Sequence, residues 1–99
     1  MARRERVTFT ASAVADLEDV RGWYCELGVP EVGERLLREV LQQAERLAEF
    51  PESGRVVPEF GNPALREIIH PPFRIVYRRD PQRVRVVRVW RSERLLGLP

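Results

Sequence analysis

The sequence has no lysine, one cysteine and one histidine among its 99 residues. A single cysteine, Cys25, cannot form a disulfide within the chain. His70 stands 45 residues away from it, so the two supply no cluster of metal ligands. All 17 basic residues are therefore arginine, a bias from which we draw no function. We expect neither a bound metal nor a cofactor.

Long hydrophobic runs are also missing. Hydrophobic residues make up 43% of the chain and charged residues 32%, which is typical of a globular protein. No stretch is long enough to form a transmembrane helix, and the N-terminal segment MARRERVTFT lacks the apolar core of a signal peptide. We expect one domain spanning 1–99, located in the cytoplasm and with no membrane partner.

The usual catalytic motifs have few candidates here. Three serines occur, and His70 is the one histidine that could activate any of them: Ser12, Ser53 and Ser92. No glycine-rich phosphate loop is present, and no spacing supports a nucleophile on a strained turn. His70 precedes two prolines, a setting more typical of a plain turn residue than of a general base.

Charge is distributed unevenly along the chain. Residues 1–63 hold eight arginines against twelve acidic residues, a net charge of −4. Residues 64–99 hold nine arginines against three acidic residues, a net charge of +6. The C-terminal third is thus a basic module, which favours an anionic partner.

The first half of the sequence predicts a strand over 6–10 and two helices. An apolar stripe at helical spacing begins just after two candidate N-cap residues, Thr10 and Ser12, and consists of Ala13, Leu17, Val20, Tyr24 and Leu27. Gly28 suits the end of that helix, and Pro30 suits the start of the next one, over 31–50. The short link between them predicts an antiparallel helical hairpin.

The second half predicts three strands, over 64–70, 73–79 and 83–91, joined by short turns as an antiparallel meander. Side chains alternate in the middle strand: one face carries Phe73, Ile75 and Tyr77, and the other carries Arg74, Val76 and Arg78. We therefore expect a two-layer α+β fold. The helical hairpin should cover the apolar face of a twisted sheet and leave the cationic face open to solvent or to an anionic partner.

Three arginines are candidates for a local cationic patch on this sheet: Arg66, Arg74 and Arg94. Trp90 lies in the last strand, where it could either fill the core or stack on a partner. Five further arginines are typical of solvated strand and turn positions: Arg78, Arg79, Arg83, Arg85 and Arg88.

Several segments resemble the RelE/ParE superfamily of toxins from bacterial toxin–antitoxin modules. They are FPESGRVVPEF at 50–60, LREIIHPPFRIVYRR at 65–79 and VRVVRVWRSERLL at 84–96. The pairs Gly54-Arg55 and Pro58-Glu59, together with Leu65-Arg66-Glu67 and the run from Phe73 to Tyr77, are similar to the ParE branch. The resemblance covers essentially the whole chain, and it implies a toxin that inhibits DNA gyrase and is neutralised by a ParD-like antitoxin.

The RelE branch of the same superfamily implies a different activity, cleavage of messenger RNA on the ribosome. Arg74 and Arg94 match basic positions of that branch, and Glu67 could then serve as the base. Glu67, however, stands where the nuclease pattern tends to place a lysine, and the chain ends at Pro99 without the C-terminal tyrosine. Action by binding is therefore favoured over catalysis. An inert nucleic-acid-binding domain is the third alternative.

The expected surface for the target or the antitoxin consists of Arg66, Arg74, Arg78, Trp90, Arg91 and Arg94. An antitoxin should place apolar side chains in grooves beside the helical hairpin and carboxylates on Arg66 or Arg74. The target is gyrase under the first alternative, and the ribosome with its messenger RNA under the second.

Overall fold

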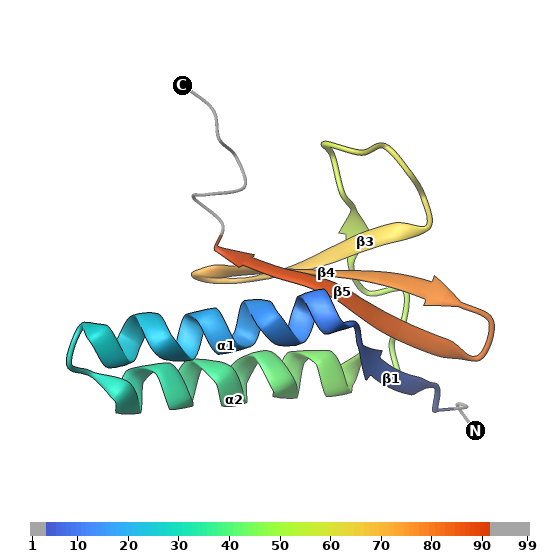
Figure 1. Ribbon diagram of the computed structural model, residues 1–99. Helices are drawn as coiled ribbons and strands as arrows, with labels where there is room; N and C mark the ends of the chain where they lie inside the picture. The colour runs from blue at the N-terminus through green and yellow to red at the C-terminus, as the bar shows by residue number, and fades with distance from the viewer. Residues whose placement is uncertain (1–3, 92–99) are drawn as a thin grey trace.

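Two helices cover one face of a five-stranded sheet in the computed structural model, which describes residues 4–91 (Figure 1). The elements in chain order are β1 (Arg6–Phe9), α1 (Ala11–Glu26), α2 (Pro30–Arg46), β2 (Arg55–Val56), β3 (Leu65–His70), β4 (Phe73–Asp80) and β5 (Arg83–Arg91). The predicted α+β fold, with a strand, a helical hairpin and then a sheet, is confirmed. Neither helix is long and apolar enough to cross a membrane.

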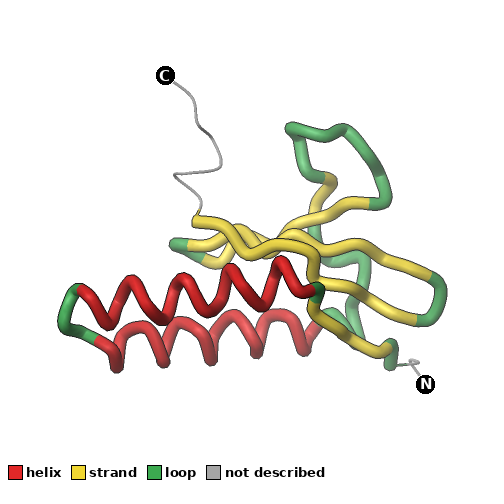
Figure 2. The backbone as a smooth tube through the Cα atoms, viewed as in Figure 1, coloured by secondary structure: helices red, strands yellow, loops and turns green. Residues whose placement is uncertain are grey.

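The strand order in the sheet is β1-β5-β4-β3-β2. Figure 2 shows the strands, in yellow, gathered on one side of the two red helices. The predicted meander forms its centre, and β1 joins the last strand in parallel, with Val7 beside Val84. Strand β2 was not predicted. It is two residues long and pairs with the first half of β3, placing Arg55 opposite Glu67. This short pairing brings the long loop after α2 onto the sheet.

Local sequence signals fix the ends of the helices. The Thr10 hydroxyl accepts a hydrogen bond from the Ala13 amide and donates one to the Val87 carbonyl, so it caps α1 and ties it to β5. Gly28 has φ +80° and Pro30 begins α2, as predicted. Helix α2 ends at Arg46 instead of Phe50, because the next amides bond to carbonyls three residues back and tighten the chain into turns.

The core lies between the helices and the sheet. Phe73, Ile75 and Tyr77 are each at most 1% exposed, which confirms the predicted apolar face of β4. The helical stripes extend further in sequence than the core does: Leu27 is 56% exposed and Leu41 is 48% exposed. Leu27 belongs to the apolar stripe predicted for the first helix, but it lies at the end of α1, beyond the sheet-covered part. Leu41 lies on the exposed side of α2.

Candidate functional site

The sheet face that points away from the helices carries a buried ion network centred on Arg74. Its Nε donates to Glu67 at 2.7 Å, and its two terminal nitrogens each donate to a Glu59 oxygen at 2.8 Å. The Arg74 side chain is only 3% exposed. Two carboxylates therefore hold this guanidinium in place, one from β3 and one from the loop that follows β2.

Glu67 is the other buried member of this network. Its side chain has no exposed surface, and its second oxygen accepts a 2.7 Å hydrogen bond from Arg55 Nε. The β2–β3 register places Arg55 directly opposite Glu67, so the two-residue strand β2 delivers the second cation. We call these four residues the closed cluster: Arg55, Glu59, Glu67 and Arg74.

The expectation that Arg74 lies on an open cationic face is wrong. Arg74, Val76 and Arg78 do share the face away from the helices, but Arg74 and Val76 are at most 2% exposed. A charge can be buried when it is paired and hydrogen-bonded. The outer partner of Arg74 could not be predicted from the sequence, because Glu59 is 15 residues away and reaches Arg74 through the β2–β3 loop.

Gly54 and Tyr77 support the closed cluster from the side. The Tyr77 hydroxyl accepts a 2.9 Å hydrogen bond from the Gly54 amide and donates one to the Pro51 carbonyl. A Cβ at Gly54 would lie 2.6 Å from the Glu67 carbonyl oxygen and 2.7 Å from the Tyr77 hydroxyl. Only glycine permits this close approach. Arg66 donates from Nη1 to the Gly54 carbonyl at 3.0 Å, which engages one of its terminal nitrogens in the same loop.

The residues of the family resemblance therefore converge on one place. Gly54-Arg55 forms the close approach and one ion pair, Pro58-Glu59 supplies the outer carboxylate, and Arg66-Glu67 supplies a loop contact and the buried carboxylate. These three pairs of residues, which carry part of the resemblance to the ParE branch, thus hold the β2–β3 loop against the sheet.

The closed cluster and its surroundings shift the pKa values of Glu59, Arg74 and Tyr77. The hydrogen bond from Arg74 lowers the pKa of Glu59 from 4.5 to about 2. Reciprocally, the hydrogen bond to Glu59 raises the pKa of Arg74 above its ordinary value, against the opposing effect of burial. Burial raises the pKa of the Tyr77 hydroxyl. Glu59 and Arg74 are therefore ionised at neutral pH, and the Tyr77 phenol is protonated.

The other predicted surface residues lie apart from the closed cluster. Trp90 is half-buried, and the Arg88 guanidinium stacks over its ring at 4.7 Å. Arg91 contacts α1, because it lies 4.4 Å over the Trp23 ring and donates to the Tyr24 hydroxyl at 3.1 Å. Arg94 falls outside the described residues. Of the three arginines of the predicted patch, the two that the structure describes, Arg66 and Arg74, both hold the β2–β3 region in place.

Arg78 differs from these, since its side chain is 59% exposed. It lies near the β4–β5 turn, where Asp80 forms ion pairs of 3.3, 3.7 and 4.0 Å with Arg78, Arg83 and Arg85. The tight turn creates this cluster, because Asp80 pairs directly with Arg83 across it.

Two contacts between helix and strand were missed by sequence reasoning. Asp16 on α1 accepts two hydrogen bonds from Arg88 and one from the Val89 amide, at 2.8 to 3.0 Å. Glu39 on α2 lies 2.9 Å from His70, whose hydrogen bond is the main cause of a lowered pKa at Glu39. Both pairs join residues far apart in sequence, so no local pattern signals them.

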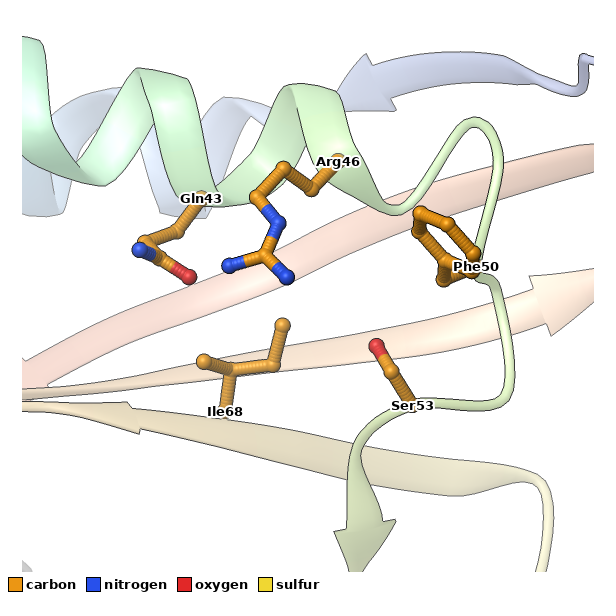
Figure 3. Close-up of a pocket in the computed structure, with 5 residues that line it drawn as sticks. All are labelled: Gln43, Arg46, Phe50, Ser53 and Ile68. Carbon is orange, nitrogen blue, oxygen red and sulfur yellow. The ribbon is translucent and has the colours of Figure 1, made fainter.

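A groove lies between the end of α2 and β3, with a volume of about 380 Å³ (Figure 3). Its lining residues are Gln43, Arg46, Phe50, Ser53 and Ile68. The Arg46 guanidinium extends from the helix toward Ile68 on the strand. Gln43 and Phe50 lie at opposite ends of the groove (Figure 3). Arg46 forms no ion pair with any residue from 4 to 91, so the groove combines apolar walls with an available positive charge.

Within the described part of the chain, no three His, Cys, Asp or Glu side chains are placed to hold a metal ion.

Solved structures with the same arrangement come from two toxin–antitoxin systems. A chain of the chromosomal ParDE system from P. aeruginosa is 22% identical, with a TM-score of 0.76 over 89% of this chain and 96% of that one. A chain of the RelBE2 toxin–antitoxin complex from Mycobacterium tuberculosis is 21% identical, with a TM-score of 0.68 over 93% and 95%. These likenesses show that the chain shares its fold with proteins of these two systems.

The family follows from the sequence itself. A model of the family described as "ParE toxin of type II toxin-antitoxin system, parDE" matches residues 7–96. This chain belongs to the ParE toxin family. No curated protein matches it in sequence.

Proposed function

We propose that this protein is a single-domain toxin, spanning 1–99, that inhibits DNA gyrase in the cytoplasm by binding and is neutralised by a ParD-like antitoxin. Membership of the ParE family supports the toxin role. The observation that favours binding over RNA cleavage is the state of Glu67 and Arg74, the two groups in residues 4–91 that a nuclease mechanism would use.

Neither group is available to a substrate. A general base must come within about 3 Å of the proton that it removes. Glu67 has no exposed side-chain surface, and both of its oxygens are hydrogen-bonded to arginines. Arg74 directs all three of its nitrogens at carboxylates, so it could contact a phosphate only by leaving Glu59 or Glu67. The cluster is built to hold a loop, which agrees with action by binding.

The experiment compares two assays on the same purified protein: supercoiling by DNA gyrase, and cleavage of messenger RNA on translating ribosomes. We expect inhibition of supercoiling and no cleavage. Cuts at codon positions, together with uninhibited gyrase, would instead establish the ribosome-dependent nuclease. Glu67→Gln keeps the shape of the buried side chain, and loss of cleavage in a folded Glu67→Gln variant would then identify Glu67 as the base.

For the antitoxin, we propose the groove between α2 and β3 as a docking site. An extended or helical antitoxin segment would place an apolar side chain between Phe50 and Ile68, and a carboxylate on Arg46. Arg74 cannot serve as this contact, because its donors are already engaged inside the fold. Arg46 can serve, because it lines the groove, is exposed and forms no ion pair within residues 4–91.

The test is Arg46→Glu, with Arg38→Glu as the matched control on the same helix. Arg38 is also exposed but does not line the groove. We expect Arg46→Glu to weaken antitoxin binding by about tenfold or more, since truncating or reversing one partner of an interfacial charge pair is costly. Equal effects of the two substitutions in isothermal titration calorimetry would rule out the groove as the docking site.

A further inference from the structure

Four arginines gather on the sheet face away from the helices, at the end marked by the β4–β5 turn. They are Arg6, Arg78, Arg83 and Arg85, which we call the arginine quartet. Arg83 is the Cα partner of both Arg6 on β1 and Asp80 on β4, and Arg85 is the partner of Arg78. Directly paired residues point to the same face of a sheet, so the four side chains share one surface.

This arrangement places like charges opposite each other. Arg78 faces Arg85 across the antiparallel pair, and Arg6 lies beside Arg83 across the parallel pair. Like charges directly opposite in a sheet are destabilising. Within residues 4–91, Asp80 is the one carboxylate that pairs with the quartet, so the four arginines and Asp80 together carry a charge of +3. Arg6 forms no ion pair with any residue from 4 to 91. The fold thus tolerates a concentration of positive charge here without neutralising it.

The contacts to Asp80 are also loose. The distances from its oxygens to Nε of Arg78, Arg83 and Arg85 are 3.3, 3.7 and 4.0 Å. Hydrogen bonds between a guanidinium and a carboxylate are usually about 2.7 to 2.9 Å long. The three arginine side chains are 59%, 42% and 37% exposed. Most of their N–H donors therefore remain open to an incoming anion.

The surroundings of the quartet favour a phosphate backbone over a protein partner. Protein interfaces depend on buried aromatic or aliphatic anchors at their centre. The exposed large hydrophobic residues of the described chain all lie elsewhere: on the helices or at the C-cap of α1, in the loops after α2 and β2, or on β3. Near the quartet, the same face offers Thr8 and Asp80. Guanidinium groups bind phosphate with two parallel hydrogen bonds, and such contacts need no apolar anchor.

We propose that the arginine quartet binds the phosphodiester backbone of a nucleic acid. The contact is independent of sequence and depends on salt, as expected of phosphate neutralisation by arginine. It lies at the opposite end of the sheet from the helical hairpin loop, where β1 and the β4–β5 turn lie side by side (Figure 1). This inference goes beyond gyrase inhibition and does not depend on it.

The test measures fluorescence anisotropy of labelled 20-mer oligonucleotides, as single strands and duplexes of DNA and RNA, with the purified protein over a range of salt concentrations. The Arg78→Gln/Arg85→Gln variant removes two quartet charges. The Arg35→Gln/Arg38→Gln variant removes the same charge from α2 and serves as control. We expect the quartet variant to bind at least tenfold more weakly, and its slope of log K against log salt to fall by about 2, as for two lost phosphate contacts. The control should change by less than threefold.

The oligonucleotide that binds most tightly identifies the source of the phosphates. The proposal is overturned if the wild-type protein binds none of them at low salt, or if both double variants lose affinity equally, because net charge alone would then explain binding. It is also overturned if poly-glutamate competes as well as DNA does, since the site would then recognise acidic protein. Circular dichroism confirms in each case that the variant is folded.

Discussion

The same face of the sheet carries two arginine clusters of opposite character. In the closed cluster, Arg74 is 3% exposed, and its nitrogens meet carboxylates at 2.6 to 2.8 Å. In the quartet, Arg78 is 59% exposed, and its contact with Asp80 is 3.3 Å long. The number of carboxylates makes the difference. Arg74 alone contacts two carboxylates, whereas three arginines of the quartet share the single carboxylate of Asp80. Identical side chains on one surface thus divide into a structural group and a group open to partners.

The largest effect is expected from removing the shared carboxylate of the closed cluster. Glu67→Ala leaves Arg74 buried without its inner partner, and breaking a buried ion pair in this way costs about 3 to 5 kcal/mol of unfolding free energy. Asp80→Ala removes the carboxylate of the quartet, where exposed pairs contribute about 0 to 1 kcal/mol. Urea denaturation of both variants checks the difference, and equal losses would contradict the division into two groups.

A smaller effect should follow from crowding the loop that closes the cluster. In Gly54→Ala, the new Cβ would lie within 2.7 Å of the Glu67 carbonyl and the Tyr77 hydroxyl, and overpacking of this kind costs about 1 to 3 kcal/mol. Gly22→Ala is the matched control, because a Cβ there meets nothing within 4 Å on helix α1. Alanine in a helix should stabilise by about 0.5 to 1 kcal/mol. Thermal unfolding that moves the same way in both variants would refute the close approach at Gly54.

Acid should loosen the cluster from its outer side. The pKa of Glu59 is about 2 in the fold and 4.5 when unperturbed, chiefly because of its hydrogen bond from Arg74. A folded pKa below the unfolded one means that ionised Glu59 stabilises the protein above about pH 4.5, and that this contribution is lost as the pH falls toward 2.

The wild-type protein should therefore be more stable than Glu59→Gln at pH 6, and the two should converge between pH 4.5 and 2. Because Glu59 is 35% exposed, solvent screening makes the difference smaller than for Glu67. Urea midpoints measured across this pH range provide the test. A difference between the two proteins that persists unchanged at pH 2 would show that the ion pair with Arg74 is not its cause.

Local chemistry made most of the fold predictable. Period-two alternation gave the apolar face of β4, and the residue types at Thr10, Gly28 and Pro30 gave the helix ends. The closed cluster was not predictable, because its register depends on β2, a two-residue strand within a loop rich in proline and glycine. Glu67 was the one indication of the cluster in the sequence, because a single acidic residue among the apolar and basic residues of a strand indicates an ion pair with a neighbouring arginine.

The quartet was not predictable either. Strands over 73–79 and 83–91 would place Arg79 opposite Arg83, but β4 extends to Asp80, so that Asp80 pairs with Arg83 and Arg78 faces Arg85. What the sequence could not show is that β1 adds Arg6 to the same surface, because the parallel pairing of β1 with β5 joins opposite ends of the chain.

The most direct test of the division between the two clusters is a paired measurement of unfolding free energy for Arg74→Gln and Arg85→Gln. Each substitution removes one guanidinium from the same sheet face. We predict that Arg74→Gln loses about 3 to 5 kcal/mol, because it leaves buried Glu67 without its inner partner. Arg85→Gln should stay within about 0.5 kcal/mol of the wild type, because it relieves the repulsion from Arg78. Equal destabilisation by the two substitutions would contradict the account.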